Sequence, residues 1–456
     1  KLILSPGAEP IKPPISGIND KAIFTVRNVT DTDRIMEYID ENKPERVVVV
    51  GAGFIGLEMA ENFFHRGVFV TIVEMAEQVM TPLDYEMAAE VHQHLKSKNV
   101  EFYLSDSVVS FNRAGDKLYV KLKSGRELQS DMVIMSIGVK PDSKLAKDCN
   151  LQLGERGGIV VDKHLTTSDP DIYAVGDAIE FINPIVGIAM PTYLAGPANK
   201  QARIVADNIV YGNQRTYKGA IATAIAKIFD ITVASCGMPE KALKRYNIPY
   251  LSSITHGASH AGYYPGAMPL TLKIVFAPDT GKLYGAQIVG YEGVDKRIDT
   301  IATVLQHNGT IYDLQEIEHA YAPPFSSAKD PVNIAGFVAE NIIKKQTRVI
   351  KWDELLQHSA DELFLLDVRT ADEFMIGSFD GAVNIPLDDI RSRMSEIPRD
   401  KKIILFCGVG LRGYVAERIL AQHGYTQVFN LNGGYKTYEH ATQKQSNEDI
   451  FESDFI

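Results

Sequence analysis

Apolar runs and amphipathic stretches alternate along the first part of the chain. Residues 47–50 are four valines, a run that is typical of a central parallel strand covered on both faces, and we expect helices to provide that cover. The stretch from Phe54 to Gly67 reads as a helix, and the apolar run 68–73 reads as the next strand. This strand-helix-strand order predicts an α/β domain with a parallel sheet.

Glycines mark the turn between the first strand and the helix. Gly51, Gly53 and Gly56 have the spacing G-x-G-x-x-G: the first permits a tight turn, the second lets the backbone approach a pyrophosphate, and the third lets the helix pack closely on the strand. The amides at the helix start, including those of Phe54 and Ile55, carry the positive end of the helix dipole. The turn therefore predicts a dinucleotide site, with an ordinary glycine turn as the alternative.

An acidic residue, Glu74, follows the second strand. It lies about 20 residues after the first glycine, where a carboxylate accepts hydrogen bonds from an adenosine ribose diol. No arginine occurs in Met75–Glu77, so a 2′-phosphate at this position would meet negative charge. We therefore predict NADH rather than NADPH.

The middle of the chain, from about Tyr217 to Ile343, reads as an α+β domain. The apolar patterns predict an element at 222–229, strands at 231–234, 270–276 and 283–289, and helices at 295–307 and 331–344.

The last hundred residues contain a cysteine in a setting that favours chemistry. Cys407 lies between the apolar run 402–406 and a helix predicted over 414–423. The amides of 408–413 can surround its sulfur and stabilise a thiolate or a persulfide anion, and Arg412 adds a positive charge. An inert buried cysteine is the alternative. We expect Asp367 and Arg369 to brace this loop rather than to react.

The charge of this loop bears on its sulfur donor. Arg412 is the only charged residue in it, which suits a neutral or extended donor better than a small dianion such as thiosulfate.

The amino-acid composition indicates the number of domains and excludes some classes of partner. A chain of 456 residues with 45% hydrophobic content supports about three domains. The net charge of −11 argues against nucleic acid or an anionic membrane as a partner, and no apolar run approaches the roughly 18 residues of a membrane span. Three cysteines, Cys149, Cys236 and Cys407, are too few for a disulfide framework, so we expect a cytoplasmic protein and assign no metal site.

Several segments resemble the flavin-dependent pyridine nucleotide-disulfide reductases. The strand and turn at 1–8, the strand and glycine turn at 131–142, and the segment 167–178 occur in the order found there. The resemblance implies that Gly138, Gly176 and Asp177 contribute to an FAD site, together with Ala195. It also implies that the strand at 1–8 leaves the FAD domain just before the NADH domain begins.

Downstream motifs narrow the resemblance to the coenzyme A-disulfide reductase family, in its rhodanese-fused branch, which includes NADH-dependent persulfide and polysulfide reductases. These motifs are His260–Gly266, Ala320–Asn333 and a carboxyl-terminal segment similar to a rhodanese domain. The resemblance implies a homodimer in which Tyr263 and Tyr321 extend over the partner's flavin. It further implies that Asn199 and Lys329 contact coenzyme A.

The implied fold class is α/β with two Rossmann-like nucleotide-binding domains, an α+β dimerisation domain and an α/β rhodanese domain. The expected segments are a remnant of the FAD domain (1–20), the NADH domain (21–140), the second part of the FAD domain (141–215), the dimerisation domain (216–343), the rhodanese domain (346–441) and an acidic tail (442–456).

One departure from the family is evident. Its members carry an FAD glycine fingerprint and a redox cysteine in roughly the first hundred residues, and this sequence has neither. We expect an omitted amino-terminal segment rather than a lost flavin half, because a chain starting in mid-sheet exposes unpaired strand edges.

These features predict an FAD- and NADH-dependent reductase of coenzyme A persulfide, coenzyme A disulfide or polysulfide, in which Cys407 carries sulfane sulfur. The alternatives are a sulfurtransferase or persulfide carrier with a non-catalytic NADH-binding portion, and an NADH oxidase or peroxidase on the same scaffold.

Overall fold

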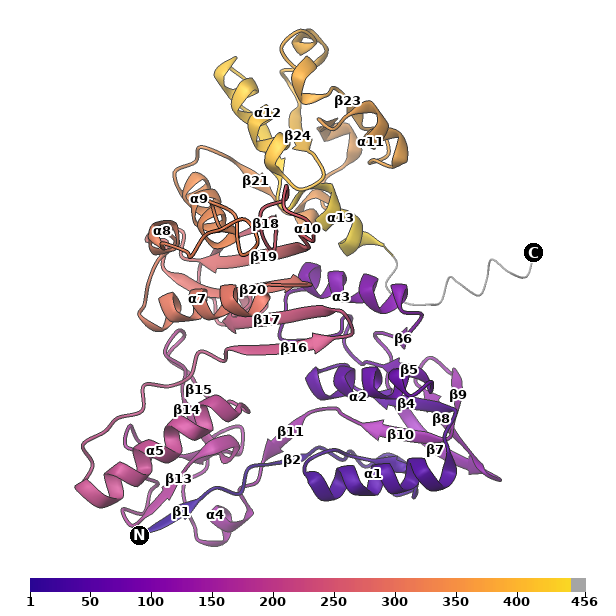
Figure 1. The fold of residues 1–456 in the computed structure, drawn as a ribbon, viewed down its shortest axis with the longest axis vertical. Coiled ribbons are helices and arrows are strands. Elements are labelled where there is room, and N and C mark those ends of the chain that lie inside the picture. Colours follow the sequence, from indigo (N-terminus) through magenta and orange to yellow (C-terminus); the bar gives the residue numbers. More distant parts are fainter. Residues whose placement is uncertain (444–456) are drawn as a thin grey trace. The chain divides into compact units, whose positions relative to one another are not determined.

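The computed structural model describes residues 1–443 (Figure 1), which form two compact units. Residues 1–82 and 94–229 make the first unit, and residues 83–93 and 230–443 lie in the second. The predicted tail falls outside the described residues except for its first two positions, of which Thr442 ends helix α13 (Gly434–Thr442).

A five-stranded parallel sheet forms the centre of the first unit. Its order is β3 (Ile23–Phe24), β10 (Met132–Met135), β4 (Arg46–Val50), β5 (Phe69–Val73) and β6 (Glu101–Tyr103). Strand β4 is central and its four valines are buried, as predicted. Helix α2 (Phe54–His65) joins β4 to β5, which confirms the strand-helix-strand unit around the glycine turn.

The two faces of this sheet are covered differently. Helix α2 contacts β4, β5 and β10. Val48 and Val50 pack in a core with Phe111 and Val120, which belong to the antiparallel sheet of β7 (Val108–Ala114), β8 (Lys117–Leu122) and β9 (Glu127–Ser130). The expectation of helices on both faces is therefore wrong for much of one face, where the inward residues of an amphipathic hairpin bury the valines equally well.

The first two strands of the chain pair with strands that follow the central sheet in sequence. β1 (Leu2–Leu4) pairs in parallel with β13 (Ile172–Ala174), the strand that precedes Gly176. β2 (Ala8–Pro10) pairs antiparallel with β11 (Val139–Pro141). The other elements of the first unit are α1 (Val29–Asn42), α4 (Lys144–Asp148), β12 (Ile159–Val160), η1 (Gly176–Ala178), β14 (Ile179–Ile182), β15 (Ala189–Met190), α5 (Ala195–Tyr211) and β16 (Ala224–Ile228).

Antiparallel strands form the first half of the second unit. β17 (Ile231–Gly237), β20 (Leu283–Gly290), β19 (Pro269–Phe276) and β18 (Leu251–Ala258) lie side by side in that order. With them are α6 (Glu240–Arg245), α7 (Val294–Gln306), α8 (Ile311–Glu316) and α9 (Pro331–Ile343). The sequence prediction missed β18, because its buried residues include polar ones, Ser252, Ser253 and Thr255.

A buried lysine links this sheet to helix α3 (Tyr85–Ser97). Lys273 is fully buried on β19, and its Nζ lies 2.8 Å from Asp84, 2.5 Å from Glu86 and 2.8 Å from Glu240. Burial alone disfavours the charge, but the three carboxylates raise the pKa of Lys273 well above its usual value. A second cation, Lys351, lies 2.5 Å from Glu240, so the ion-pair network also includes the carboxyl-terminal part of the chain.

The carboxyl-terminal module (residues 349–442) contains a second parallel sheet. Its order is β21 (Val349–Ile350), β25 (Val428–Leu431), β24 (Lys402–Phe406), β22 (Leu363–Asp367) and β23 (Val383–Asn384). Around it lie α10 (Trp352–Leu355), η2 (Ala360–Glu362), α11 (Ala371–Ile376), η3 (Leu387–Asp389), η4 (Met394–Glu396), α12 (Leu411–Gln422) and α13. Helix α12 begins three residues before the predicted position.

Hydrogen bonds join this module to β18. The Asn432 side chain accepts from the Ile254 amide at 3.0 Å. The Nε2 atom of His256 lies 3.0 Å from the Gly433 carbonyl and 3.1 Å from the Thr437 hydroxyl. Because a carbonyl only accepts, Nε2 carries the hydrogen. Burial, with Lys436 adding to its effect, lowers the pKa of His256 to about 4.

A neutral, half-buried His256 predicts acid sensitivity of the second unit. Its pKa is about 4 when folded against 6.5 when unfolded, so only the unfolded chain takes up a proton between these values. The contribution is complete above pH 6.5 and falls by up to about 3 kcal/mol as the pH drops to 4. The fluorescence of the single tryptophan, Trp352 in α10, should report a lower urea midpoint at pH 4.5 than at pH 7.

The variant His256→Gln should be less stable at pH 7 but should lose less stability on acidification. Exposed His65, changed to Gln, is the matched control and should behave as the parent chain. An unchanged acid response in the His256 variant would contradict the assignment.

Candidate functional site

The glycine turn after β4 has the geometry of a dinucleotide cradle. A Cβ on Gly51, whose φ is +99°, would lie 2.2 Å from the Ser136 carbonyl oxygen, and a Cβ on Gly56 would lie 2.0 Å from the Gly51 oxygen. Backbone contacts therefore require glycine at both positions. A Cβ on Gly53 would meet nothing within 4 Å. The second glycine thus borders open space, which fits a backbone that approaches a pyrophosphate.

Other predicted residues surround this cradle. Phe54 and Ile55 are the first residues of α2, and Gly53 offers no side chain to cap their amides. Glu74 is held next to the turn, because its two oxygens accept from the amides of Ala52 at 2.7 Å and Ala76 at 2.8 Å. This fixed carboxylate fits the hydrogen bonds that a ribose diol donates.

The second predicted cofactor segment is also held by backbone contacts. Gly176 has φ +78°, and its amide donates to the Gln201 side chain on α5 at 2.7 Å. Burial raises the pKa of the neighbouring Asp177 carboxyl. Ala195 is the exposed first residue of the 17-residue helix α5, so the start of this helix lies on the element that supports the Gly176 turn. These features fit an anionic, hydroxyl-rich group such as FAD.

Two further residues shape this part of the chain: Gly138, at a turn that the sequence predicted, and Gln201, which the sequence prediction missed. Gly138 has φ +102° and its carbonyl accepts from the Ile11 amide at 3.0 Å, so it makes the turn between β10 and β11. Gln201 was missed, because a glutamine within a helix carries no sequence signal for the Gly176 turn that it binds.

The Cys407 loop lies between a strand and a helix, as predicted. Cys407 follows β24, is only 1% exposed, and its Sγ accepts from the Gly410 amide at 3.2 Å. Gly410 has φ +99°, which a side chain would strain, and α12 begins at the next residue. The sulfur is therefore placed where a backbone amide stabilises negative charge.

The start of α13 supports the loop from outside. The amides of Tyr435 and Lys436 donate to the carbonyls of Cys407 at 2.8 Å and Gly408 at 3.0 Å. A Cβ on Gly434 would lie 2.6 Å from the Cys407 oxygen. The sequence prediction missed this support, although the pair Gly433-Gly434 was visible as a signal.

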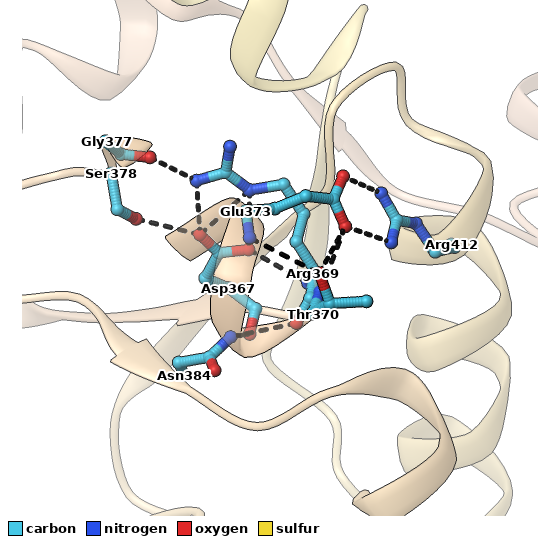
Figure 2. Close-up of polar contacts among 8 residues, drawn as sticks. All are labelled: Asp367, Arg369, Thr370, Glu373, Gly377, Ser378, Asn384 and Arg412. Atoms are coloured by element: carbon cyan, nitrogen blue, oxygen red, sulfur yellow. Dashed lines mark hydrogen bonds and ion pairs between the residues drawn. The ribbon is translucent and has the colours of Figure 1, made fainter. Parts of the chain in front are cut away.

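Arg412 does not carry a free charge. Its guanidinium donates to Glu373 through two hydrogen bonds of 2.7 and 2.6 Å (Figure 2). The pair lowers the pKa of Glu373 to about 2, and it raises the pKa of Arg412, to which Cys407 also contributes. Glu373 was missed because its spacing from Thr370 matches a helix capping box, which the structure also contains.

Asp367 and Arg369 form a buried bidentate pair next to this one (Figure 2). Ser378 donates to Asp367 at 2.8 Å, and the Arg369 guanidinium lies 4.6 Å from the ring centroid of Tyr435. Since the Tyr435 amide binds the Cys407 carbonyl, this geometry agrees with a bracing role.

The structure brings Tyr263 and Tyr321 together. Their hydroxyls lie 3.0 Å apart, although the residues are far apart in sequence. The hydrogen bond raises the pKa of Tyr263, whose side chain is 76% exposed. Two phenols are thus presented at a surface of the second unit.

The remaining predicted residues belong to different units. Asn199 is exposed on α5 of the first unit, and its amide donates to the Ala195 carbonyl at 2.9 Å. Lys329 is exposed in the second unit. Burial raises the pKa of the Cys236 thiol to about 12, and Cys149 is an exposed residue that ends α4.

Three family models match the chain. Residues 1–199 match "Pyridine nucleotide-disulphide oxidoreductase", residues 223–331 match the dimerisation domain of the same class, and residues 351–441 match "Rhodanese-like domain". Fold and sites thus define a pyridine nucleotide-disulphide oxidoreductase with a rhodanese-like domain.

Individual similar proteins indicate the family within this class. Coenzyme A disulfide reductase of Staphylococcus aureus is 36% identical over 340 residues, which cover 75% of this chain and 76% of that protein. The structure of reduced Bacillus anthracis CoADR-RHD matches with a TM-score of 0.94 and 50% identity, covering 96% of this chain and 79% of that one. An NAD-dependent persulfide reductase from A. fulgidus matches with a TM-score of 0.89, 37% identity and the same coverages. The chain belongs to the coenzyme A disulfide reductase family.

Within residues 1–443, no helix combines the length and the apolar character that crossing a membrane demands.

The cradle geometry predicts that one glycine substitution lowers the stability of the fold and that another weakens NADH binding. Gly56→Ala forces a Cβ against the Gly51 carbonyl and should destabilise the first unit by about 3 kcal/mol. Gly53→Ala, into open space at φ −78°, should retain the fold but weaken NADH binding roughly tenfold. Thermal unfolding by circular dichroism and NADH titration test the pair, and equal stability of the two variants would contradict the assignment.

The α13 contact predicts that Gly434→Ala impairs the Cys407 loop. The added Cβ must displace the Cys407 carbonyl, so loading of sulfur onto Cys407 should fall about tenfold or more. Gly381→Ala is a matched control, since Gly381 has φ +76° but open space around it. Mass spectrometry measures the sulfur loaded onto Cys407 in the two variants. If both variants lost loading equally, backbone strain alone would explain the effect.

Proposed function

We propose that this protein is an NADH- and FAD-dependent reductase of coenzyme A persulfide, coenzyme A disulfide or polysulfide, whose Cys407 carries sulfane sulfur as a persulfide. The observation that carries the proposal is the presence, in one chain, of a dinucleotide cradle and a thiol loop built to hold a sulfur anion. The names of the similar proteins, coenzyme A disulfide reductase and NAD-dependent persulfide reductase, support this substrate class.

The cradle supplies the reductant. The turn at Gly51–Gly56 and the first amides of α2 bind the pyrophosphate, and Glu74 accepts hydrogen bonds from the adenosine ribose. Because the Ala52 and Ala76 amides fix its carboxylate, a 2′-phosphate would meet a charge that cannot move away. This favours NADH over NADPH.

The segment Gly176–Asp177, with the start of α5 at Ala195, is proposed to hold FAD, and Gly138 shapes the turn that leads to it. The chemistry that FAD supplies is acceptance of hydride from the nicotinamide and delivery of two electrons to a sulfur–sulfur bond. Asp177, whose pKa is raised by burial, orients hydroxyl groups of the cofactor.

Tyr263 and Tyr321 are proposed to assist the reduction in a homodimer, each pair serving the partner subunit. Reduction of a disulfide releases a thiolate, which a phenol stabilises by donating a hydrogen bond or a proton. The Tyr321 contact keeps Tyr263 protonated for that role. Asn199 and Lys329 are proposed contacts of coenzyme A.

Cys407 is proposed to collect sulfur. Its thiolate attacks the outer sulfur of a persulfide R–S–SH, which forms Cys407–S–SH and releases R–S⁻. The Gly410 amide stabilises the resulting persulfide anion after it loses its proton. Neither Cys149 nor the buried Cys236 has comparable surroundings.

We also propose the domain limits that the sequence predicts. Residues 1–20 and 141–215 form the FAD-binding part, 21–140 the NADH-binding part, 216–343 the dimerisation part and 346–441 the rhodanese part.

The test compares two substrates in the variant Cys407→Ser. NADH oxidation with polysulfide should fall about tenfold or more, whereas NADH oxidation with coenzyme A disulfide should change little, because only the former needs the sulfur carrier. Cys149→Ser is the control and should leave both rates unchanged.

Equal losses on both substrates would contradict the relay. A wild-type protein that loads sulfur on Cys407 but oxidises no NADH with any of these substrates would instead be a sulfurtransferase or carrier.

A further inference from the structure

We infer that Glu373 is a positioning residue that sets the donor preference of the Cys407 loop, by holding the charge of Arg412 so that sulfane donors with little charge at the sulfur are favoured over thiosulfate. This inference rests on the proposed sulfur-carrying role of Cys407 and specifies the chemical class of its donor.

The first support is the geometry of the Arg412–Glu373 pair. Both guanidinium nitrogens that face Glu373 are engaged, and the two side chains are 36% and 38% exposed. Donors approaching the loop therefore meet a neutral pair rather than an isolated cation. Because the hydrogen bonds are bidentate and charge-assisted, turning Arg412 towards an incoming anion costs both of them.

The second support is that the Glu373 carboxylate is held in place and cannot move with Arg412 if Arg412 turns away. The amide and the hydroxyl of Thr370 each lie 3.1 Å from Glu373 Oε2, the same oxygen that accepts from Arg412. These contacts belong to the capping box of α11, so the carboxylate is fixed by the start of a helix. Figure 2 shows Thr370 and Arg412 converging on this one carboxylate.

The third support is the character of the exposed loop. Its other projecting side chains are apolar: Val409 is 44% exposed and Leu411 is 70% exposed. Sulfane sulfur attached to an uncharged group is itself apolar and polarisable, so it loses little by contact with these side chains. A compact dianion loses hydration there and gains no free cation in return.

The two donor reactions differ in charge at the reacting sulfur. With thiosulfate, Cys407–S⁻ attacks the outer sulfur, forms Cys407–S–S⁻ and releases sulfite, SO₃²⁻, so two negative charges must approach the thiolate. With a persulfide, Cys407–S⁻ and R–S–SH give Cys407–S–SH and R–S⁻, and the donor is neutral when it approaches. Coenzyme A persulfide also lacks charge near its reacting sulfur, because its phosphates lie at the far end of a long uncharged arm. They are farther from the sulfur than the screening length, which is roughly 8 Å at physiological salt.

The experiment measures sulfur transfer to cyanide by the full-length chain, with thiosulfate or 2-hydroxyethyl persulfide as the donor. This assay needs neither NADH nor flavin, so it reads donor preference independently of the reductase activity. Glu373→Gln keeps the capping box and the shape of the side chain but removes the charge that holds Arg412. We expect kcat/KM for thiosulfate, relative to that for the persulfide, to rise on the order of tenfold at low salt, and the rise to shrink as salt screens the charge.

A matched control comes from the same module. Arg393 and Glu396 form a second bidentate pair with similar exposure, 38% and 47%, and Glu396→Gln removes the same charge from it. The donor ratio of this variant should stay at the wild-type value. Glu373→Asp, which restores the negative charge, should move the ratio back towards wild type.

Three results would overturn the inference while leaving the proposed carrier role intact. They are an unchanged donor ratio in Glu373→Gln while both rates fall together, an equal shift in Glu396→Gln, and a wild-type preference for thiosulfate. If the wild-type chain transfers sulfur from neither donor, the inference fails together with the proposed carrier role. If donor preference shifts as expected but NADH oxidation with polysulfide is absent, only the proposed reductase function fails.

Discussion

Both functional loops depend on close contacts between backbone groups. These contacts occur at positions where a side chain would not fit. At the dinucleotide cradle, Gly56 lies against the carbonyl of Gly51, and this contact seats the start of α2 next to the end of β4. At the thiol loop, Gly434 lies against the carbonyl of Cys407, which seats the start of α13 against the backbone of the loop. In each case the amides at a strand-to-helix turn are left facing the place where an anion binds. The chemistry differs, but the physical arrangement is the same.

Buried and half-buried charges in the second unit are organised in pairs and networks. Lys273 is surrounded by three carboxylates, and Asp367 holds Arg369 in bidentate geometry. Breaking such pairs leaves one charge without compensation in a poorly hydrated place, which costs more than the pair contributes to stability. The pairs therefore act mainly as positional constraints. Arg369 contacts Tyr435, which binds the Cys407 loop, and Glu373 holds Arg412 at the end of that loop.

Attachment of the carboxyl-terminal module to the antiparallel sheet bears on how sulfur moves. Asn432, His256 and the Gly433 carbonyl join α13 to β18, and the same helix supports the Cys407 loop. The segment around the start of α13 thus makes hydrogen bonds both to the Cys407 loop and to β18. A carrier with a long flexible arm, such as coenzyme A, suits a thiol held in this way better than movement of the whole module.

Elements with a local signal could be predicted from the amino-acid sequence. The valine run, the glycine spacing and Glu74 specified the cradle, because a tight turn and a helix start depend on residues adjacent in sequence. The strand, cysteine and glycines at 402–413 specified the thiol loop for the same reason. The distant side chains that complete these loops could not be predicted in this way. Glu373 on Arg412, Gln201 on Gly176, Gly434 on Cys407 and the hairpin over Val48 and Val50 all depend on pairings between segments far apart in sequence, and such pairings follow from three-dimensional packing rather than from any local pattern.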